Sequence, residues 1–317
     1  MSLLEINKLK TYYSTYRGYI KAVDGVSLKI RSGEALGLVG ESGCGKSTLA
    51  LAIMHLLPSN ARIIEGSIFF DGQDISNIDE DLLRKEYRWK KMAIVFQEAM
   101  NALNPVFKIG DQITEGIITH EHMPLKEAID RARSALSIVG LDPELLVKYP
   151  HELSGGMRQR VMIAMALSCN PNFLIADEPT TALDVLIQAQ IMKLLKNLQK
   201  KLDLSMMLIT HDLSIVAETC DKCAIMYAGK LVEYSDIVTI FKKPLHPYTK
   251  GLIQAFPNLR GDLKKLISIK GSPPNLLDPP SGCVFHPRCS LAKNICKERA
   301  PILVESASGH TVACHLL

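Results

Sequence analysis

The chain has 317 residues, enough for two domains of ordinary size or for one large domain with additions. Hydrophobic residues make up 47% of it and charged residues 22%, which excludes a largely disordered chain and predicts a substantial apolar core. The net charge of +4 is too small to indicate a nucleic-acid partner, because such partners bind concentrated basic surfaces.

No segment of the sequence predicts membrane insertion or secretion. The uncharged stretch 161–176 is shorter than a bilayer span and contains Asn170, Pro171 and Asn172. Charged residues follow Met1 closely, without the apolar run of a secretory signal. We therefore expect the protein to lie in the cytoplasm or peripherally on the cytoplasmic face of a membrane.

Strand and helix patterns alternate along the first 235 residues. Apolar runs predict strands within 1–30 and at 35–39, 67–70, 92–96, 173–176 and 206–209. Apolar residues three and four apart predict helices from Ser47 and at 111–147, 157–167, 185–202 and 213–220. This order predicts an α/β fold with a mainly parallel central sheet. After about Tyr234, seven prolines between Pro244 and Pro280 predict a loop-rich appendage outside that sheet.

The segment GESGCGKST, residues 40–48, fits the phosphate-loop pattern G-x-x-x-x-G-K-[ST] between a predicted strand and a predicted helix. Glycines in such a loop let backbone N–H groups face phosphate oxygens, and the positive end of the helix faces the same charge. We expect Lys46 to reach the β and γ phosphates and Ser47 to bind Mg²⁺. The expected nucleotide-binding residues here are Gly40, Ser42, Gly43, Cys44, Gly45, Lys46, Ser47 and Thr48.

Two carboxylates follow the predicted strand 173–176. We expect Asp177 to hold Mg²⁺ through water and Glu178 to polarise an attacking water molecule. A phosphate loop followed by such an acidic pair predicts a nucleotide hydrolase.

The segment LSGGMRQR, residues 153–160, places Ser154, Gly155 and Gly156 at the start of a predicted helix, where N–H donors favour an anion. LSGGMRQR resembles the signature motif of ATP-binding cassette (ABC) ATPases. In that family two cassettes meet head to tail, and each ATP lies between the phosphate loop of one and the signature of the other. The resemblance implies a RecA-like core sheet, an antiparallel β subdomain and a helical subdomain at about 98–160.

The same resemblance implies roles for further residues. Gln97 matches the Q-loop glutamine, which contacts Mg²⁺ and senses the membrane subunit. Residues 181–184 match the D-loop at the dimer seam, and His211 matches the switch histidine at the γ-phosphate. Tyr13 best matches the aromatic residue that stacks on adenine, and its alternatives are Tyr12 and Tyr16. The implied catalytic residues are Lys46, Glu178 and His211.

Two regions resemble the ATPases of dipeptide and oligopeptide importers in particular. One is FQEAMNALNP at 96–105, and the other is the tail, with HPYTKGL at 246–252 and GCVFHPRC at 282–289. The likeness implies an ABC ATPase domain over 1–235 and a C-terminal extension over 236–317. It also implies that ATP hydrolysis powers the import of di- or oligopeptides. Nickel and glutathione importers share the extension, so their cargoes are alternatives.

Four of the eight cysteines crowd the last 35 residues, at Cys283, Cys289, Cys296 and Cys314. They lack the close pair that is typical of structural zinc sites, whereas four thiolates can hold an iron–sulfur cluster. Some members of the resembling family carry a 4Fe–4S cluster in this extension. We therefore expect a 4Fe–4S cluster, with zinc and then unligated or disulfide-bonded cysteines as alternatives. His286, His310 and His315 are alternative ligands.

The resemblance also implies partners. The chain would dock on two separate membrane permease subunits through 97–110, and it would pair head to tail with a paralogous ATPase or a second copy of itself. An extracytoplasmic peptide-binding protein would act indirectly.

Two rival functions remain. A soluble ABC ATPase acting on nucleic acid or ribosomes normally has two fused cassettes or a coiled-coil insertion, whereas this chain has one phosphate loop and one signature. A regulatory cassette that binds ATP without hydrolysing it conflicts with the presence of Glu178 and His211.

Overall fold

The computed structural model describes residues 2–97, 102–181, 183–255, 269–307 and 309–317. The expected docking segment and D-loop therefore fall partly outside the described residues, at 98–101 and at Ala182. The chain forms two compact units. Unit 1 comprises 31–34 and 77–208, and unit 2 comprises Ser2–Ile30, Ala35–Ser76 and Ile209–Leu317.

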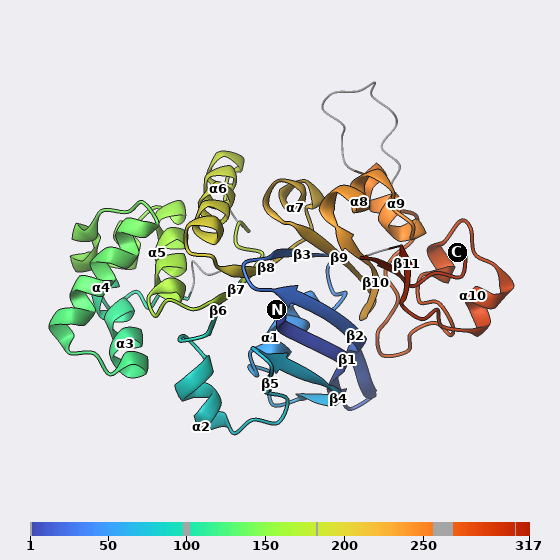
Figure 1. The fold of residues 1–317 in the computed structure, drawn as a ribbon, viewed down its shortest axis with the longest axis horizontal. Coiled ribbons are helices and arrows are strands. Elements are labelled where there is room, and N and C mark those ends of the chain that lie inside the picture. Colours follow the sequence, from blue (N-terminus) through green and yellow to red (C-terminus); the bar gives the residue numbers. More distant parts are fainter. Residues whose placement is uncertain (1, 98–101, 182, 256–268, 308) are drawn as a thin grey trace. The chain divides into compact units, whose positions relative to one another are not determined.

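Unit 2 contains a four-stranded sheet in the order β2-β1-β4-β5 (Figure 1). Its strands are β1 (Ser2–Thr15), β2 (Gly18–Arg31), β4 (Ala61–Phe70) and β5 (Gln73–Asp74). β4 runs antiparallel to both of its neighbours, with Leu4 of β1 opposite Phe70. Leu4 and Phe70 are fully buried, so this sheet turns an apolar face to a core. This is the expected antiparallel β subdomain.

The other strands of unit 2 follow the order β11-β12-β10-β9-β3. They are β3 (Ala35–Val39), β9 (Lys222–Tyr227), β10 (Lys230–Asp236), β11 (Val304–Ala307) and β12 (His310–Val312). β3 and β9 are parallel, whereas β10 is antiparallel to β9. Every residue of β3 is buried, which explains its uninterrupted apolar sequence.

The expectation that the tail lies outside the sheet is wrong. β12 pairs antiparallel with β10 and places Val312 opposite Glu233. The Glu233 carboxylate is fully buried, accepts hydrogen bonds from the backbone N–H groups of Leu245 and His246, and lies 2.8 Å from His310 Nε2. A buried carboxylate requires such partners, and the tail supplies all three of them. The sequence did not predict this pairing, because the strands involved are short and follow a Pro-rich segment.

Within its described residues unit 2 also contains six helical segments, several of them capped by their preceding residue. They are α1 (Lys46–Ile53), α7 (Leu213–Thr219), α8 (Ile237–Lys242), α9 (Pro247–Gln254), the 3₁₀ helix η5 (His286–Arg288) and α10 (Asn294–Glu298). Asp212 and Asp236 accept hydrogen bonds from the first turns of α7 and α8. The His246 Nδ1 atom accepts the Tyr248 N–H at 3.1 Å and so caps α9.

Unit 1 has parallel strands and a group of helices. Its strands are β6 (Met92–Val95), β7 (Phe173–Asp177) and β8 (Ser205–Thr210), which continues into unit 2 after Leu208. β6 and β7 are parallel, and every residue of β7 is buried. The predicted strands at 92–96, 173–176 and 206–209 are thus confirmed to within two residues.

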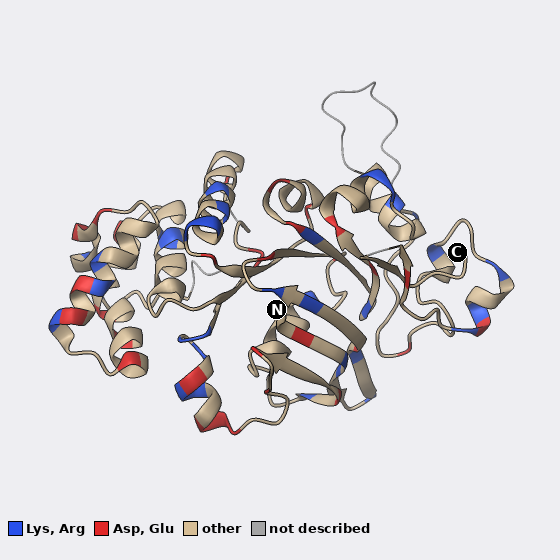
Figure 2. Ribbon diagram, viewed as in Figure 1, with Lys and Arg blue, Asp and Glu red and all other residues tan. Residues whose placement is uncertain are grey.

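The helical segments of unit 1 include those predicted at 111–147, 157–167 and 185–202. They are α2 (Glu80–Leu82), the π-helix η1 (Leu83–Tyr87), α3 (Ile109–Glu121), α4 (Leu125–Ile138), the 3₁₀ helices η3 (Pro143–Val147) and η4 (Pro150–Glu152), α5 (Gly155–Leu167) and α6 (Val185–Lys201). Figure 2 shows both signs of charge on these helices, and neighbours such as Asp130 and Arg133 form ion pairs. No helix in the described residues has the length and apolarity needed to cross a bilayer.

The cap of α9 makes stability depend on pH. Burial, with a smaller effect of Lys250, lowers the pKa of His246 from 6.5 to about 4. The unfolded chain therefore takes up a proton as the pH falls below about 6.5, while the folded chain stays neutral until about 4. We predict that the wild type loses about 2 kcal/mol more unfolding free energy than His246→Asn between pH 7 and pH 4.5.

Urea unfolding at several pH values measures this difference. Asn keeps a capping side chain but cannot titrate, and His122→Asn, at an exposed position, is the matched control. Parallel pH curves for the wild type and His246→Asn would contradict the assignment.

Candidate nucleotide-binding site

The phosphate loop of unit 2 connects the end of β3 to the start of α1, as the sequence predicts. Gly45 is the N-cap of α1 and has a φ of 103°. A Cβ atom on Gly45 would lie 1.9 Å from the carbonyl oxygen of Ala22, and one on Gly40 would lie 2.2 Å from that of Met226. Both distances are shorter than real contacts, so the path of the loop requires glycine at both positions.

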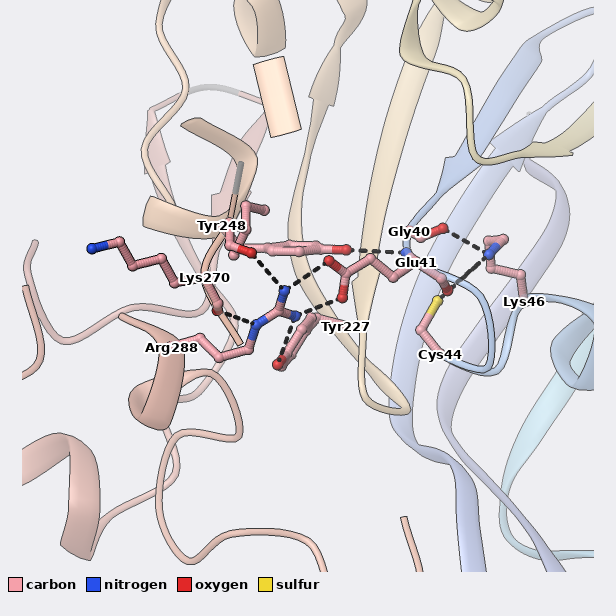
Figure 3. A network of polar contacts seen from close by, with 9 residues as sticks. Gly40, Glu41, Cys44, Lys46, Tyr227, Tyr248, Lys270 and Arg288 are labelled. Atoms are coloured by element: carbon pink, nitrogen blue, oxygen red, sulfur yellow. Dashed lines mark hydrogen bonds and ion pairs between the residues drawn. The ribbon is translucent and has the colours of Figure 1, made fainter. Parts of the chain in front are cut away.

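Lys46 lies inside this loop with only 5% of its surface exposed. Its Nζ atom donates to the carbonyl oxygens of Gly40 at 2.8 Å and Glu41 at 3.1 Å (Figure 3). A buried ammonium group needs acceptors, and phosphate oxygens are stronger acceptors than neutral carbonyls. The Cys44 Sγ atom lies 3.8 Å from the same Nζ, but burial raises the pKa of this thiol.

The structure separates the three tyrosines that were candidates for adenine stacking. The Tyr13 hydroxyl lies 3.2 Å from Thr48 Oγ1 of α1. The Tyr12 hydroxyl instead donates to Asp24, which pairs with Lys230 at 2.7 Å. The Tyr16 side chain is 90% exposed. Tyr13 thus contacts the helix that follows the phosphate loop, and its role at adenine stays a prediction.

In unit 1 the structure brings two predicted site residues together. Gln97 Nε2 donates to Glu178 Oε2 at 3.1 Å, and Thr181 Oγ1 donates to the same oxygen at 3.2 Å. Glu178 follows β7 directly and has a φ of 44°, a left-handed conformation that costs an L-residue about 1 kcal/mol. The two hydrogen bonds to Oε2 restrict the orientation of this carboxylate.

The remaining predicted residues also stand at the ends of elements. Asp177 is the last residue of β7 and is buried, and His211 follows β8 and is exposed. Ser154 is the N-cap of α5, and its Oγ accepts the Met157 N–H at 3.3 Å. Gly155 and Gly156 form the first turn of α5. A Cβ on Gly156 would lie 2.8 Å from Ile187 of α6, so the close approach of these two helices depends on this glycine.

The four tail cysteines carry free thiols; Cys296 is buried and the others are half-buried. Burial raises the pKa of Cys283, Cys289 and Cys314, and the neighbouring tail thiols raise each of these pKa values further. Within the described ranges, however, no group of three or more His, Cys, Asp or Glu residues is arranged to hold a metal ion.

The three histidines named as alternative ligands have other partners. His286 Nδ1 lies 3.0 Å from the Cys283 carbonyl oxygen, and His315 Nε2 lies 2.8 Å from that of Arg299. His310 pairs with Glu233.

Glu41, Tyr248 and Arg288 had no predicted role at the site. Arg288 forms a bidentate ion pair with Glu41 of the phosphate loop, with N–O distances of 2.6 and 3.0 Å. The Tyr248 hydroxyl accepts the backbone N–H of Glu41 at 3.0 Å. Glu41 and Arg288 are 247 positions apart, and no local pattern predicts a contact over that separation.

Two family profiles match the chain. The profile of the ABC transporter family matches residues 23–181, and that of the oligopeptide/dipeptide transporter C-terminal region matches residues 232–296. The oligopeptide transport ATP-binding protein AppD of Bacillus subtilis is 49% identical over 99% of this chain and 97% of its own length. The oligopeptide transport ATP-binding protein OppD of Escherichia coli is 46% identical over 99% of this chain and 93% of its own length.

Solved structures agree with these matches. The ATP-binding cassette MJ0796, in a dimeric post-hydrolysis state bound to ADP and Pi, is 29% identical with a TM-score of 0.66, over 74% of this chain and 98% of that one. The cbiO1 protein of Clostridium perfringens, part of an ABC transporter complex, is 30% identical with a TM-score of 0.66, over 76% of this chain and 91% of that one. The expected α/β fold with a RecA-like core is therefore confirmed, and the chain belongs to the ABC transporter family as one of its ATPases.

Proposed function

We propose that this protein is the ATP-hydrolysing subunit of a peptide importer and powers the uptake of di- or oligopeptides through separate membrane permease subunits. The observation that carries this proposal is the match of residues 232–296 to the oligopeptide/dipeptide transporter C-terminal region. An ABC cassette alone supports ATP hydrolysis without indicating a cargo. The extension, and the full-length similarity to proteins named for oligopeptide and dipeptide transport, support peptides as that cargo.

In this proposal the described loop binds the triphosphate. Lys46 exchanges its two backbone acceptors for β- and γ-phosphate oxygens, and Tyr13 stacks on adenine. Ser47, Gln97 and Asp177 offer the oxygen donors that Mg²⁺ prefers, and the bound ion supplies neutralisation of the phosphate charge.

Hydrolysis then depends mainly on charge stabilisation. Glu178, oriented by Gln97 and Thr181, polarises the attacking water, but a carboxylate is a weak base. Lys46, His211 and the N–H groups of a partner cassette's signature turn therefore stabilise the transition state. Closure of the two cassettes around ATP excludes water, and hydrolysis reopens them, which supplies the mechanical output.

Exposed apolar side chains support the proposed partners. Val106 and Phe107, in the expected docking segment, are 71% and 52% exposed, as expected of a surface that a permease subunit covers. Val185 and Leu186, directly after the D-loop, are also exposed and suit the seam with a second cassette, either a paralogue or a second copy. The protein would act peripherally on the cytoplasmic face of the membrane, and an extracytoplasmic binding protein would deliver the peptide.

We further propose that the tail cysteines hold a 4Fe–4S cluster, with zinc as the alternative. The support is the donor set: four free thiols in one short segment. Transport requires no electron transfer, so the group would stabilise the fold of the extension.

We predict that Glu178→Gln binds ATP normally but hydrolyses it at least about 100-fold more slowly than the wild type, because an amide cannot accept the proton of water. Phosphate release and ATP binding, measured on the same preparation, test this expectation. The control Glu115→Gln, at an exposed position of α3, should keep wild-type turnover. Wild-type hydrolysis by Glu178→Gln would remove Glu178 from the mechanism.

The cargo is tested in cells. Deleting the gene should abolish uptake of a labelled di- or oligopeptide, and a plasmid carrying the wild type, but not Glu178→Gln, should restore it. Unchanged peptide uptake in the deletion strain, with loss of nickel or glutathione uptake instead, would contradict the peptide assignment.

For the cysteines, protein purified without oxygen should contain four iron and four sulfide per chain and absorb broadly in the visible range. Cys289→Ser should lose most of this absorbance, whereas Cys169→Ser, a core thiol, should keep it. A colourless wild type with one zinc per chain would eliminate the iron–sulfur proposal.

A further inference from the structure

Arg288 connects the C-terminal extension to the phosphate loop within unit 2. It directly precedes Cys289 and ends the 3₁₀ helix η5. A guanidinium group has five N–H donors, and all five are used here. The acceptors are Lys270 O at 3.0 Å, Glu41 Oε2 at 2.6 Å, Tyr227 Oη at 3.3 Å, Glu41 Oε1 at 3.0 Å and Ile269 O at 3.4 Å (Figure 3).

Burial makes this contact strong. The Arg288 side chain is 6% exposed and that of Glu41 is 26% exposed, so the ion pair is only weakly screened by water. Phe285, three residues before Arg288, packs against Tyr227 and Tyr248 with ring centroids 5.1 and 5.3 Å apart. The aromatic contacts hold the extension on β9 and thereby limit the positions that the guanidinium can take.

Glu41 is held at each of its polar groups. Its carboxylate pairs with Arg288, its backbone N–H donates to Tyr248 Oη, and its backbone carbonyl accepts from Lys46 Nζ. Two of these three contacts come from the extension, and the third is made by the lysine that binds phosphate. Glu41 therefore links Arg288 and Tyr248 to Lys46 through a single residue of the loop.

We propose that Arg288 and Tyr248 are positioning residues of the ATP site, which act through Glu41 to set the conformation of the phosphate loop and hence its affinity for nucleotide. The inference rests on the proposed role of residues 40–48 in binding ATP. It gives the extension a function in nucleotide binding that is separate from any group held by its cysteines. Because coupling between two sites is reciprocal, bound nucleotide must also stabilise the segment around Arg288.

A double-mutant cycle on the full-length chain tests the proposal. The affinity for MgADP is measured by calorimetry for the wild type, Arg288→Ala, Glu41→Gln and the double variant. We expect Arg288→Ala to weaken MgADP binding about tenfold in the wild-type background and less than twofold in the Glu41→Gln background. In the second background the ion pair through which Arg288 acts on the loop is already lost. Arg299→Ala, an exposed arginine of the extension, should bind within twofold of the wild type.

The cycle separates positioning from a merely structural role. If Arg288 only stabilised the extension, its removal would weaken binding equally in both backgrounds, and that result would overturn the proposal. Tyr248→Phe provides a milder variant that keeps the buried ring and removes only the acceptor of the Glu41 N–H, and it should weaken binding about threefold. If Arg288→Ala does not fold, Arg288→Lys replaces it in the same cycle, since lysine keeps the charge but loses the bidentate fork.

Hydrogen exchange supplies the reciprocal measurement. MgADP should slow exchange of the Arg288 and Cys289 amides in the wild type and leave it unchanged in Glu41→Gln. Equal slowing in both proteins would contradict the route through Glu41. Failure of the wild type to bind MgADP would refute the proposed function itself, whereas normal binding with additive variants would refute only the positioning role.

Discussion

The buried ammonium group of Lys46 is the constraint on which the described nucleotide loop depends. An almost fully buried cation must be surrounded by acceptors, and the loop supplies carbonyl oxygens of Gly40 and Glu41 at 2.8 and 3.1 Å. A loop that bends closely enough to do so leaves no space for side chains at Gly40 and Gly45. The same tight bend of the loop suits a ligand that carries several negatively charged oxygens.

The contacts of Glu41 extend this constraint to the C-terminal part of unit 2. The residue is held from one side by Lys46 and from the other by Arg288 and Tyr248. The extension is in turn anchored by a buried carboxylate, Glu233, whose partners include His246 and His310. Polar groups that are expensive to bury without partners therefore join the tail to the cassette at two places. The rings of Phe285, Tyr227 and Tyr248 pack together near the Arg288 contact.

The sequence predicted those features whose physical cause is local. The phosphate loop, the acidic pair after β7 and the cap of α5 each depend on a short run of residues, and the structure places them at the expected ends of elements. Features that depend on distant partners were not predictable. The pairing of β12 with β10 and the ion pair of Arg288 with Glu41 join segments separated by more than 70 positions. Neither has a pattern in the chain that distinguishes it from an ordinary polar loop.

A high-resolution crystal structure of the full-length chain with MgADP would show whether Lys46 and the loop bind phosphate in this way. We expect Lys46 Nζ to leave the carbonyl oxygens of Gly40 and Glu41 for oxygens of the β-phosphate, while Arg288 stays paired with the Glu41 carboxylate. Nucleotide bound elsewhere, with Lys46 still donating to both carbonyls, would contradict this expectation.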